Sequence, residues 1–256
     1  MKWRLVLVGP RSGAENMARD EGLMARARET GEAVFSVYSW GAPTLSLGRN
    51  QAARDKYDLA AIEDRGIQVV RRPTGGRALL HYREVTYSVT APVATEEPIT
   101  ESYGRINALL LDALSALGVN ASEAAAETRT LRPGDIPCFA EPAKGELSWK
   151  GDKLVGSAQV RENEALLQHG SILIEDDQAV IAEVLLSHPS IDAAPAATLA
   201  RALGRTPPVD EVANALFDAV RRTEDGGATL LDESDLRSAT ARYLDKYMSE
   251  WWTWRR

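Results

Sequence analysis

Residues 145–175 restrict what this chain can fold into more than any other stretch of its sequence. They read GELSWKGDKLVGSAQVRENEALLQHGSILIE. Three runs with strand composition are separated by turn residues at Lys150–Gly151–Asp152 and Glu162–Asn163–Glu164. Strands joined by turns this short have to lie side by side, because a parallel crossover needs a much longer connection. The sequence therefore predicts a mixed or antiparallel sheet in the middle of the fold.

Further strands are expected before that stretch. Runs rich in β-branched and aromatic residues lie at 4–9, 33–40, 44–48, 67–72 and 79–92. In the last run, Thr86, Ser88 and Thr90 alternate with apolar residues. This period of two predicts a half-buried strand, with one face in the core and one face in solvent.

Helical patterns flank the predicted strands. Ser12 and Glu15 have the spacing of a capping box, and Gly31 can end the helix that they begin. Other helices are predicted at 100–118, 178–186, 209–222 and 233–254. Together the elements predict an α+β fold: a mixed or antiparallel central sheet, flanking helices and a C-terminal helical tail. We expect a single domain over 1–256, with its core at about 30–220 and the segment of about 209–256 packed on it.

Charge and cysteine content limit the function classes. The 256 residues include 37 acidic and 30 basic side chains, a net charge of −7, which argues against a nucleic-acid partner. One cysteine cannot form an internal disulfide. The first 16 residues contain only a short apolar run, too short for a secretory signal or a membrane span. We therefore expect a cytoplasmic protein without a membrane partner.

The segment RRPTGGRALLH, from Arg71 to His81, is the first candidate site. Its two adjacent glycines permit a left-handed backbone, and exposed backbone N–H groups beside Arg71, Arg72 and Arg77 would suit an anion or a developing oxyanion. The alternative is an ordinary hairpin turn with solvated arginines. No phosphate-binding G-x-x-x-x-G-K-[ST] motif is present.

Cys138 and Lys153 form the second candidate. A thiol reacts as the thiolate, and its ordinary pKa near 8.5 leaves little thiolate at neutral pH. A neighbouring ammonium would favour the charged form. The alternatives are that Cys138 is a small buried hydrophobic residue and that Lys153, which follows a turn, is exposed to solvent.

Small residues in two predicted strands form the third candidate. Gly156 and Ser157, and then His169–Gly170, interrupt strand patterns at points where a ligand or another backbone could approach closely. Taken alone, His169 also fits a hydrogen-bonded core histidine. A content of three histidines and one cysteine argues against a zinc site, and no G-x-S-x-G elbow is present.

Several of these segments resemble one protein superfamily in the same order along the chain. The segments ENMARDEGLM, PTLSLGRNQ, RRPTGGRALLHYREVTYSV, PCF and KLVGSAQVR…LLQHGSILI are similar to the biotin/lipoate ligase and octanoyltransferase superfamily, over residues from about 3 to about 175. The sequence most resembles its cysteine-dependent octanoyltransferases. These enzymes move octanoate from acyl carrier protein to a lysine of a lipoyl domain or of the glycine-cleavage H protein.

The resemblance implies a role for each candidate. Cys138 would be the acyl-thioester nucleophile, and Lys153 would lower the pKa of its thiol and contact the acyl carbonyl. Neither ATP nor a metal or other cofactor would be needed. The residues implied to bind substrate are Arg72, Gly75, Gly76, Arg77, His81, Gly156, Ser157, Ala158, Gln159, His169 and Gly170.

Three other functions compete with this interpretation. An ATP-dependent lipoate-protein ligase would make lipoyl-adenylate and would have no use for the thiol. An amidotransferase would use the same cysteine to move octanoate from H protein to other lipoyl domains. A non-catalytic binding protein would keep the pocket without turnover. Because the protein substrates are expected to be acidic, we also expect a basic face built partly from Arg71, Arg72 and Arg77.

Overall fold

The structure is a computed structural model that describes residues 1–94, 96–124, 145–187 and 195–256. Its strands are β1 (Trp3–Arg11), β2 (Ala33–Trp40), β3 (Thr44–Leu47), β4 (Gln68–Arg71), β5 (Leu79–His81), β6 (Glu84–Pro92), β7 (Ser122–Glu123), β8 (Leu147–Trp149), β9 (Asp152–Glu162), β10 (Ala165–Leu173) and β11 (Thr229–Leu230). Its helices are α1 (Gly13–Thr30), α2 (Leu59–Asp64), α3 (Ile99–Ala116), α4 (Val180–Glu183), α5 (Leu199–Leu203), α6 (Val209–Thr223), the 3₁₀ turn η1 (Glu233–Leu236), α7 (Arg237–Met248) and α8 (Glu250–Thr253).

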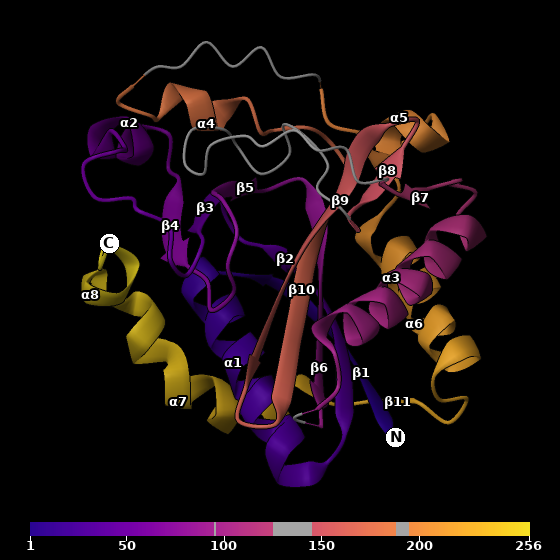
Figure 1. Ribbon diagram of the computed structural model, residues 1–256. Coiled ribbons are helices and arrows are strands. Elements are labelled where there is room, and N and C mark those ends of the chain that lie inside the picture. The colour runs from indigo at the N-terminus through magenta and orange to yellow at the C-terminus, as the bar shows by residue number, and fades with distance from the viewer. Residues whose placement is uncertain (95, 125–144, 188–194) are drawn as a thin grey trace.

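Two sheets organise the fold. Eight strands form the main sheet in the order β11-β1-β2-β6-β10-β9-β8-β7, and β4-β3-β5 form a smaller sheet. Only β11-β1 and β1-β2 pair in parallel within the main sheet; all its other neighbours are antiparallel. In Figure 1, α1 covers one side of the main sheet and α3 and α6 cover the other. The predicted α+β class with a mixed sheet is confirmed.

The strand meander predicted from residues 145–175 is present. β8, β9 and β10 are consecutive antiparallel neighbours. The first turn holds Lys150 and Gly151 at φ of 54° and 89°, and the second holds Asn163 and Glu164 at 49° and 63°. Left-handed backbone at these positions reverses the chain within two or three residues, as the turn chemistry indicated.

The capping box that begins α1 is also confirmed. The Ser12 side chain accepts from the Glu15 amide, and the Glu15 carboxylate accepts from the Ser12 amide at 3.0 Å. Gly31 ends the helix in the left-handed conformation. The expected start of α3 at Thr100 is late by one residue, since the helix begins at Ile99 after Pro98.

The expectation of a half-buried β6 is wrong. Thr86, Ser88 and Thr90 are all 2% exposed or less, so both faces of the strand are buried. The reason is that α1 packs over the face that carries the hydroxyls. Polar alternation normally marks a solvent face, but here it marks a polar layer between the sheet and a helix.

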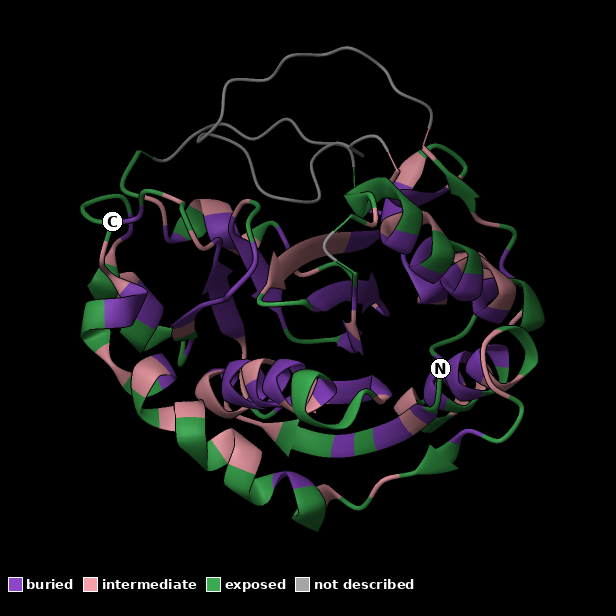
Figure 2. Ribbon diagram, turned by 60° about the horizontal axis from the view of Figure 1, so that its bottom comes forward, coloured by how far each residue is buried: buried purple, intermediate pink, exposed green. Residues whose placement is uncertain are grey.

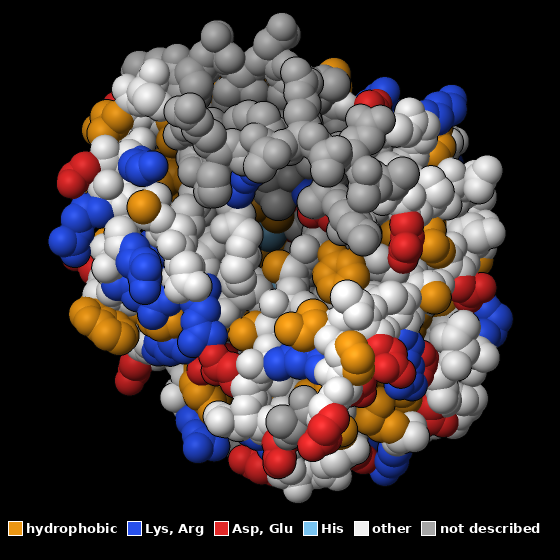
Figure 3. Space-filling model, viewed as in Figure 1, with side chains coloured by type: hydrophobic (Ala, Val, Ile, Leu, Met, Phe, Trp, Pro, Cys, Tyr) orange, Lys and Arg blue, Asp and Glu red, His pale blue; other side chains and the backbone are white. Residues whose placement is uncertain are grey.

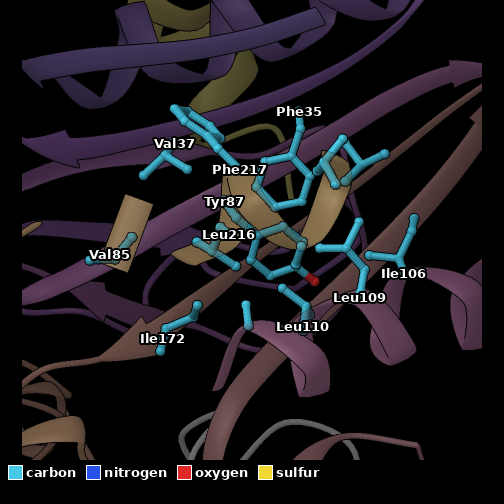
Figure 4. Packing of buried hydrophobic residues seen from close by; sticks show 14 of the residues in the cluster. Phe35, Val37, Val85, Tyr87, Ile106, Leu109, Leu110, Ile172, Leu216 and Phe217 are labelled. Atoms are coloured by element: carbon cyan, nitrogen blue, oxygen red, sulfur yellow. The ribbon is translucent and has the colours of Figure 1, made fainter. Parts of the chain in front are cut away.

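The hydrophobic core lies mainly between the sheet and the pair α3 and α6. Phe35 of β2 and Tyr87 of β6 stack with ring centroids 5.9 Å apart, and Phe217 of α6 meets Phe35 edge-on. Figure 4 shows these rings together with Leu109 and Leu110 of α3. Figure 2 shows the buried inner surfaces of the helices against the sheet and their exposed outer surfaces. Among the described residues, no helix has the length and apolar character needed to cross a bilayer.

The C-terminal elements fold back on the first half of the chain. α7 packs against α1, and α8 contacts β4. Trp252 donates its indole N–H to the carbonyl of Arg71 at 2.7 Å, and the Arg71 guanidinium donates to the carbonyl of Thr253 at 2.8 Å. The tail therefore braces the strand that leads into the loop at residues 72–78.

Candidate active site

A cavity opens between the two sheets and α1. It contains about 510 Å³ of space unfilled by atoms, part of which is open solvent, and about 90 Å³ of that space can hold the centre of a water molecule. Figure 3 shows a hollow in this face of the molecule. The cavity is lined by Met17, Tyr38, Trp40, Arg72, Gly76, Leu79, His81, Thr86, Glu146, Gly156, Ser157, Ala158, His169, Gly170 and Ser171.

The loop after β4 forms one wall through its backbone. Gly76 has φ of 101°, so the left-handed conformation that the paired glycines permit is used at this position. The Arg72 guanidinium threads the loop, donating to the carbonyls of Gly75 and Arg77 at 3.0 and 2.6 Å and to that of Ser46 at 2.9 Å. These bonds hold the loop in one shape beside the cavity.

The predicted basic face at Arg71 and Arg72 is wrong. Arg71 is fully buried and Arg72 is 5% exposed. Arg71 donates to the carbonyls of Gly48 and Gln51 at 2.6 and 2.8 Å, as well as to the α8 carbonyl described above. Burial, and then repulsion by the cations of Arg255 and Arg256, lowers the pKa of Arg71 to about 10. Both arginines therefore hold backbone together rather than attract a partner from solvent.

Gly48 packs closely against this loop. A Cβ at position 48 would lie 1.9 Å from the carbonyl oxygen of Gly76. We expect Gly48→Ala to lower the free energy of unfolding by about 1–3 kcal/mol or more, because two backbones would have to separate. Gly75→Ala is the matched control: among the described residues, no atom outside residues 74–76 lies within 4 Å of its added Cβ, so the change should stay within about 0.5 kcal/mol. Urea unfolding of both variants checks this, and equal losses would contradict it.

His81 lies in a buried polar network. Its Nδ1–H donates to the Glu84 carboxylate at 2.7 Å, and the Ser46 hydroxyl donates to its Nε2 at 2.7 Å. Ser46 in turn accepts from Arg72 at 2.9 Å, which leaves its proton for the imidazole. The Trp40 ring stacks on the imidazole at 4.0 Å. Burial lowers the pKa of His81, more strongly than the Glu84 carboxylate raises it, so the ring is neutral and firmly oriented.

His169 lies in a second network of the same form. Asp20 of α1 accepts from His169 Nδ1–H and from the Tyr38 hydroxyl, each at 2.9 Å. The Thr74 hydroxyl lies 2.6 Å from His169 Nε2, on the other side of the ring. Asp20 is fully buried. His169 is a hydrogen-bonded core histidine, as one interpretation of the sequence expected. Its ring also forms part of the cavity wall, as the other interpretation expected.

The small residues of β9 and β10 lie where the two strands pack closely against each other and against Tyr87. Gly170 lies against the carbonyl of Gly156 and the side chains of Tyr87 and Ser157, where an added Cβ would come within 2.5, 2.7 and 2.8 Å of them. The Tyr87 and Ser157 hydroxyls are 2.7 Å apart. Burial raises the pKa of Tyr87 to about 12, so the phenol stays protonated. A larger side chain at residue 170 would displace the wall of the cavity.

Lys153 is buried, so the alternative of a solvent-exposed lysine is wrong. Its side chain is 2% exposed, and its ammonium donates to the Glu146 carboxylate at 2.6 Å. Glu146 lies just before β8 and is itself part of the cavity wall. The hairpin of β8 and β9 brings the two charges together. The site therefore contains a desolvated ammonium-carboxylate pair beside an apolar pocket.

Most of the predicted site residues meet at this cavity. Eight line it: Arg72, Gly76, His81, Gly156, Ser157, Ala158, His169 and Gly170. Gly75, Arg77 and Gln159 are not among the lining residues, and Gln159 instead hydrogen-bonds Gln168 and Ser102. Cys138 lies outside the described residues, so its predicted place stays a prediction.

The sequence interpretation missed the carboxylates of the site. Asp20, Glu84 and Glu146 hold His169, His81 and Lys153 respectively. One signal was available for Asp20, which lies on the same helical face as the buried Met17. In the described ranges, no cluster of three or more His, Cys, Asp or Glu side chains could bind a metal ion. The absence of a cofactor stays a prediction.

Comparisons with known proteins agree on one family. Residues 12–221 match the lipoyl protein ligase A/B catalytic domain. The octanoyltransferase LipM of Kyrpidia tusciae is 43% identical over 193 residues, 72% of this chain and 70% of that protein. That of Symbiobacterium thermophilum is 35% identical across 99% of this chain and 98% of its own length.

Solved structures support the same fold. Lipoate-protein ligase A bound with ATP has a TM-score of 0.81 at 25% identity, with 99% of each chain covered. A putative lipoate protein ligase from T. acidophilum with bound lipoic acid has a TM-score of 0.78 at 22% identity, covering 99% of this chain and all of that one.

Proposed function

The chain belongs to the lipoyl protein ligase A/B catalytic family, and from this premise we propose that it is an octanoyltransferase that works through a thioester on Cys138. It would take octanoate from octanoyl-acyl carrier protein and pass it to a lysine of a lipoyl domain or glycine-cleavage H protein, in the cytoplasm. The octanoyltransferases at 35% and 43% identity support the activity. The observation that carries the proposal is the buried Lys153–Glu146 pair beside a cavity with small-residue walls.

The first half of the reaction exchanges one thioester for another. The Cys138 thiolate attacks the carbonyl carbon of the octanoyl thioester, the bond from that carbon to the carrier's sulfur breaks, and the carrier's thiolate takes up the proton that Cys138 lost. A buried ammonium at Lys153 would favour the Cys138 thiolate and the developing oxyanion, because charges attract more strongly where water is excluded. The donor is already activated, so ATP is not required.

The second half forms the product amide. The uncharged ε-amine of the acceptor lysine attacks the octanoyl-cysteine carbonyl, the carbon–sulfur bond breaks, and the amine proton passes to the departing sulfur. Cys138 is thereby restored as a thiol. Lys153 is the proposed carrier of that proton: its ammonium would donate a proton to the departing sulfur and then take up the proton lost by the attacking amine.

The cavity suits the acyl chain on chemical grounds. Met17, Trp40 and Leu79 give it apolar surface, while Gly156 and Gly170 leave room between the strands. Each methylene buried there contributes about 0.8 kcal/mol. His81 is held neutral by burial and both ring nitrogens of His169 are hydrogen-bonded, so neither imidazole presents an unsatisfied nitrogen to the chain.

Intact mass measurement tests the proposal. Mixed with octanoyl-acyl carrier protein and no ATP, the protein should gain one octanoyl group that hydroxylamine removes and that peptide mapping places on Cys138. Adding a lipoyl domain should then discharge it. Failure of the protein to gain this group would refute the thioester route.

The fold likeness to an ATP-bound lipoate-protein ligase supports a second candidate, an ATP-dependent ligase. That enzyme would modify the lipoyl domain only with ATP and free octanoate or lipoate. The amidotransferase alternative differs in its donor, and it would be favoured if octanoylated H protein, but not octanoyl-acyl carrier protein, charged Cys138.

A further inference from the structure

A group of cations lies beside the cavity without forming part of it. It consists of Arg49, Arg54, Lys56, Arg255 and Arg256, which we call the basic patch. None of the five lines the cavity. In Figure 3, Lys and Arg side chains gather on the same side of the molecule where Figure 1 places the C-terminal end.

Backbone hydrogen bonds hold the two segments of the basic patch together. The amides of Ala53 and Arg54 both donate to the carbonyl of Arg256 at 2.9 Å. The Arg255 guanidinium donates to the carbonyl of Arg49 at 2.7 Å, and that of Arg54 donates to the carbonyl of Trp254 at 3.3 Å. The cations are therefore fixed near one another by the fold.

The basic patch is unusual for this chain, which is acidic overall. Most surface arginines pair with a carboxylate, such as Arg105 with Glu224 and Arg222 with Asp112. Within the described residues, no ion pair is recorded for the side chains of Arg54, Lys56, Arg255 or Arg256. The carboxylate of Asp55, next to Arg54 in the chain, is exposed, and that of Glu162 pairs with Arg49.

Like charges crowd in the basic patch. Burial and the neighbouring cations of Arg49 and Arg256 lower the pKa of Arg255. An acidic partner would relieve this repulsion. α8, which leads into the patch, also carries Trp251, and its 73% exposure gives the surface an aromatic side chain of the kind that anchors protein interfaces.

The position of the basic patch suits the protein that donates the acyl group better than the protein that accepts it. The Arg49 amide donates to the carbonyl of Thr74 at 2.8 Å, and Gly48 packs against Gly76, which lines the cavity. The patch thus adjoins the cavity wall but stands outside it. A carrier that presents its acyl group on a long flexible arm can dock there and still reach the cavity. A lysine on the body of an acceptor domain has a shorter reach and needs contact at the cavity itself.

Resting on the proposed function, we propose that the basic patch is the docking surface for the acidic acyl carrier protein that donates octanoate. The test compares Arg54→Glu/Arg256→Glu with Arg28→Glu/Arg237→Glu, which makes the same change in net charge at exposed arginines outside the patch. Each protein is charged at low salt with octanoyl-carrier protein and with octanoyl-pantetheine, a small donor that needs no docking surface. Binding of the carrier protein is measured in parallel.

We expect the patch variant to lose at least about 10-fold in kcat/KM with the carrier, and to keep its rate with octanoyl-pantetheine and its melting temperature. Added salt should slow the wild type and the control variant but not the patch variant. Unchanged kcat/KM with the carrier, equal loss in the control, or equal loss with the small donor would overturn the proposal. So would a loss confined to transfer onto the lipoyl domain, which would assign the patch to the acceptor.

The same experiment separates failure of docking from failure of the proposed function. If neither donor charges the wild type, the thioester route is wrong, and carrier binding alone then decides the proposal. Tight binding by the wild type and weak binding by the patch variant would support it, and equal binding would overturn it.

Discussion

Cys138→Ala is expected to lower the rate of octanoyl transfer to a lipoyl domain by about 10⁴-fold or more, the scale of losing a catalytic nucleophile. Without a thiolate, no covalent octanoyl enzyme can form. The acceptor amine would then have to attack the donor thioester directly, in one difficult step instead of two easier ones. Single-turnover transfer from octanoyl-acyl carrier protein measures the effect. The variant should keep the melting temperature of the wild type to within a few degrees.

The single cysteine permits a matched control without mutation. Because Cys138 is the only thiol in the chain, iodoacetamide can alkylate the protein at one cysteine side chain only. Alkylation should abolish transfer, and prior charging with octanoate should protect the protein. Transfer by Cys138→Ala at more than a tenth of the normal rate would remove this cysteine from the mechanism.

Lys153→Met is expected to lower octanoyl transfer by about 10³-fold, the range of a lost general acid or base. Methionine fills similar space but has no charge, so it neither favours the Cys138 thiolate nor moves a proton. Removing the ammonium also leaves the buried Glu146 carboxylate without its 2.6 Å partner contact, which costs up to about 3–5 kcal/mol of stability. Rapid-quench acylation and urea unfolding measure the two effects separately.

A double variant separates chemistry from stability. Lys153→Met/Glu146→Met removes both charges, and apolar residues of similar volume often restore the stability lost with one member of a buried pair. We expect stability to recover and transfer to stay about 10³-fold low. Recovery of transfer along with stability would mean that Lys153 acts only by holding the fold. Lys153→Arg keeps the positive charge but places it differently. Low transfer activity in this variant would show that the position of the charge also matters.

Local patterns predicted much of this fold from the sequence. The Ser12–Glu15 capping box, the Gly31 end of α1 and the turns that join β8, β9 and β10 depend on residues close together in the chain. Such features are determined by short-range sterics and hydrogen bonds, which the sequence displays directly. The short elements α2, α5, β7 and β11 were not predicted, since so few residues form no recognisable period.

The errors arose where burial depends on distant segments. Arg71 and Arg72 look like surface cations, yet carbonyls from β3, the loop at 72–77 and α8 surround them. The hydroxyls of β6 look like a solvent face, but α1 covers them. The cations that do remain at the surface, such as Arg54 and Arg256, are about 200 residues apart in sequence and are brought together by the fold, in which the Arg54 amide donates to the Arg256 carbonyl.

By itself, the sequence determined the α+β class, most of the strands and helices, and the chemistry available at Cys138, Lys153 and the glycine-rich segments. Residue type and local spacing carry that information. Only the tertiary structure decided which carboxylate holds Lys153, that His81 and His169 are hydrogen-bonded into a cavity wall, and where basic charge reaches solvent. Burial and charge pairing are properties of the packed chain, because they depend on which distant segments exclude water from a side chain.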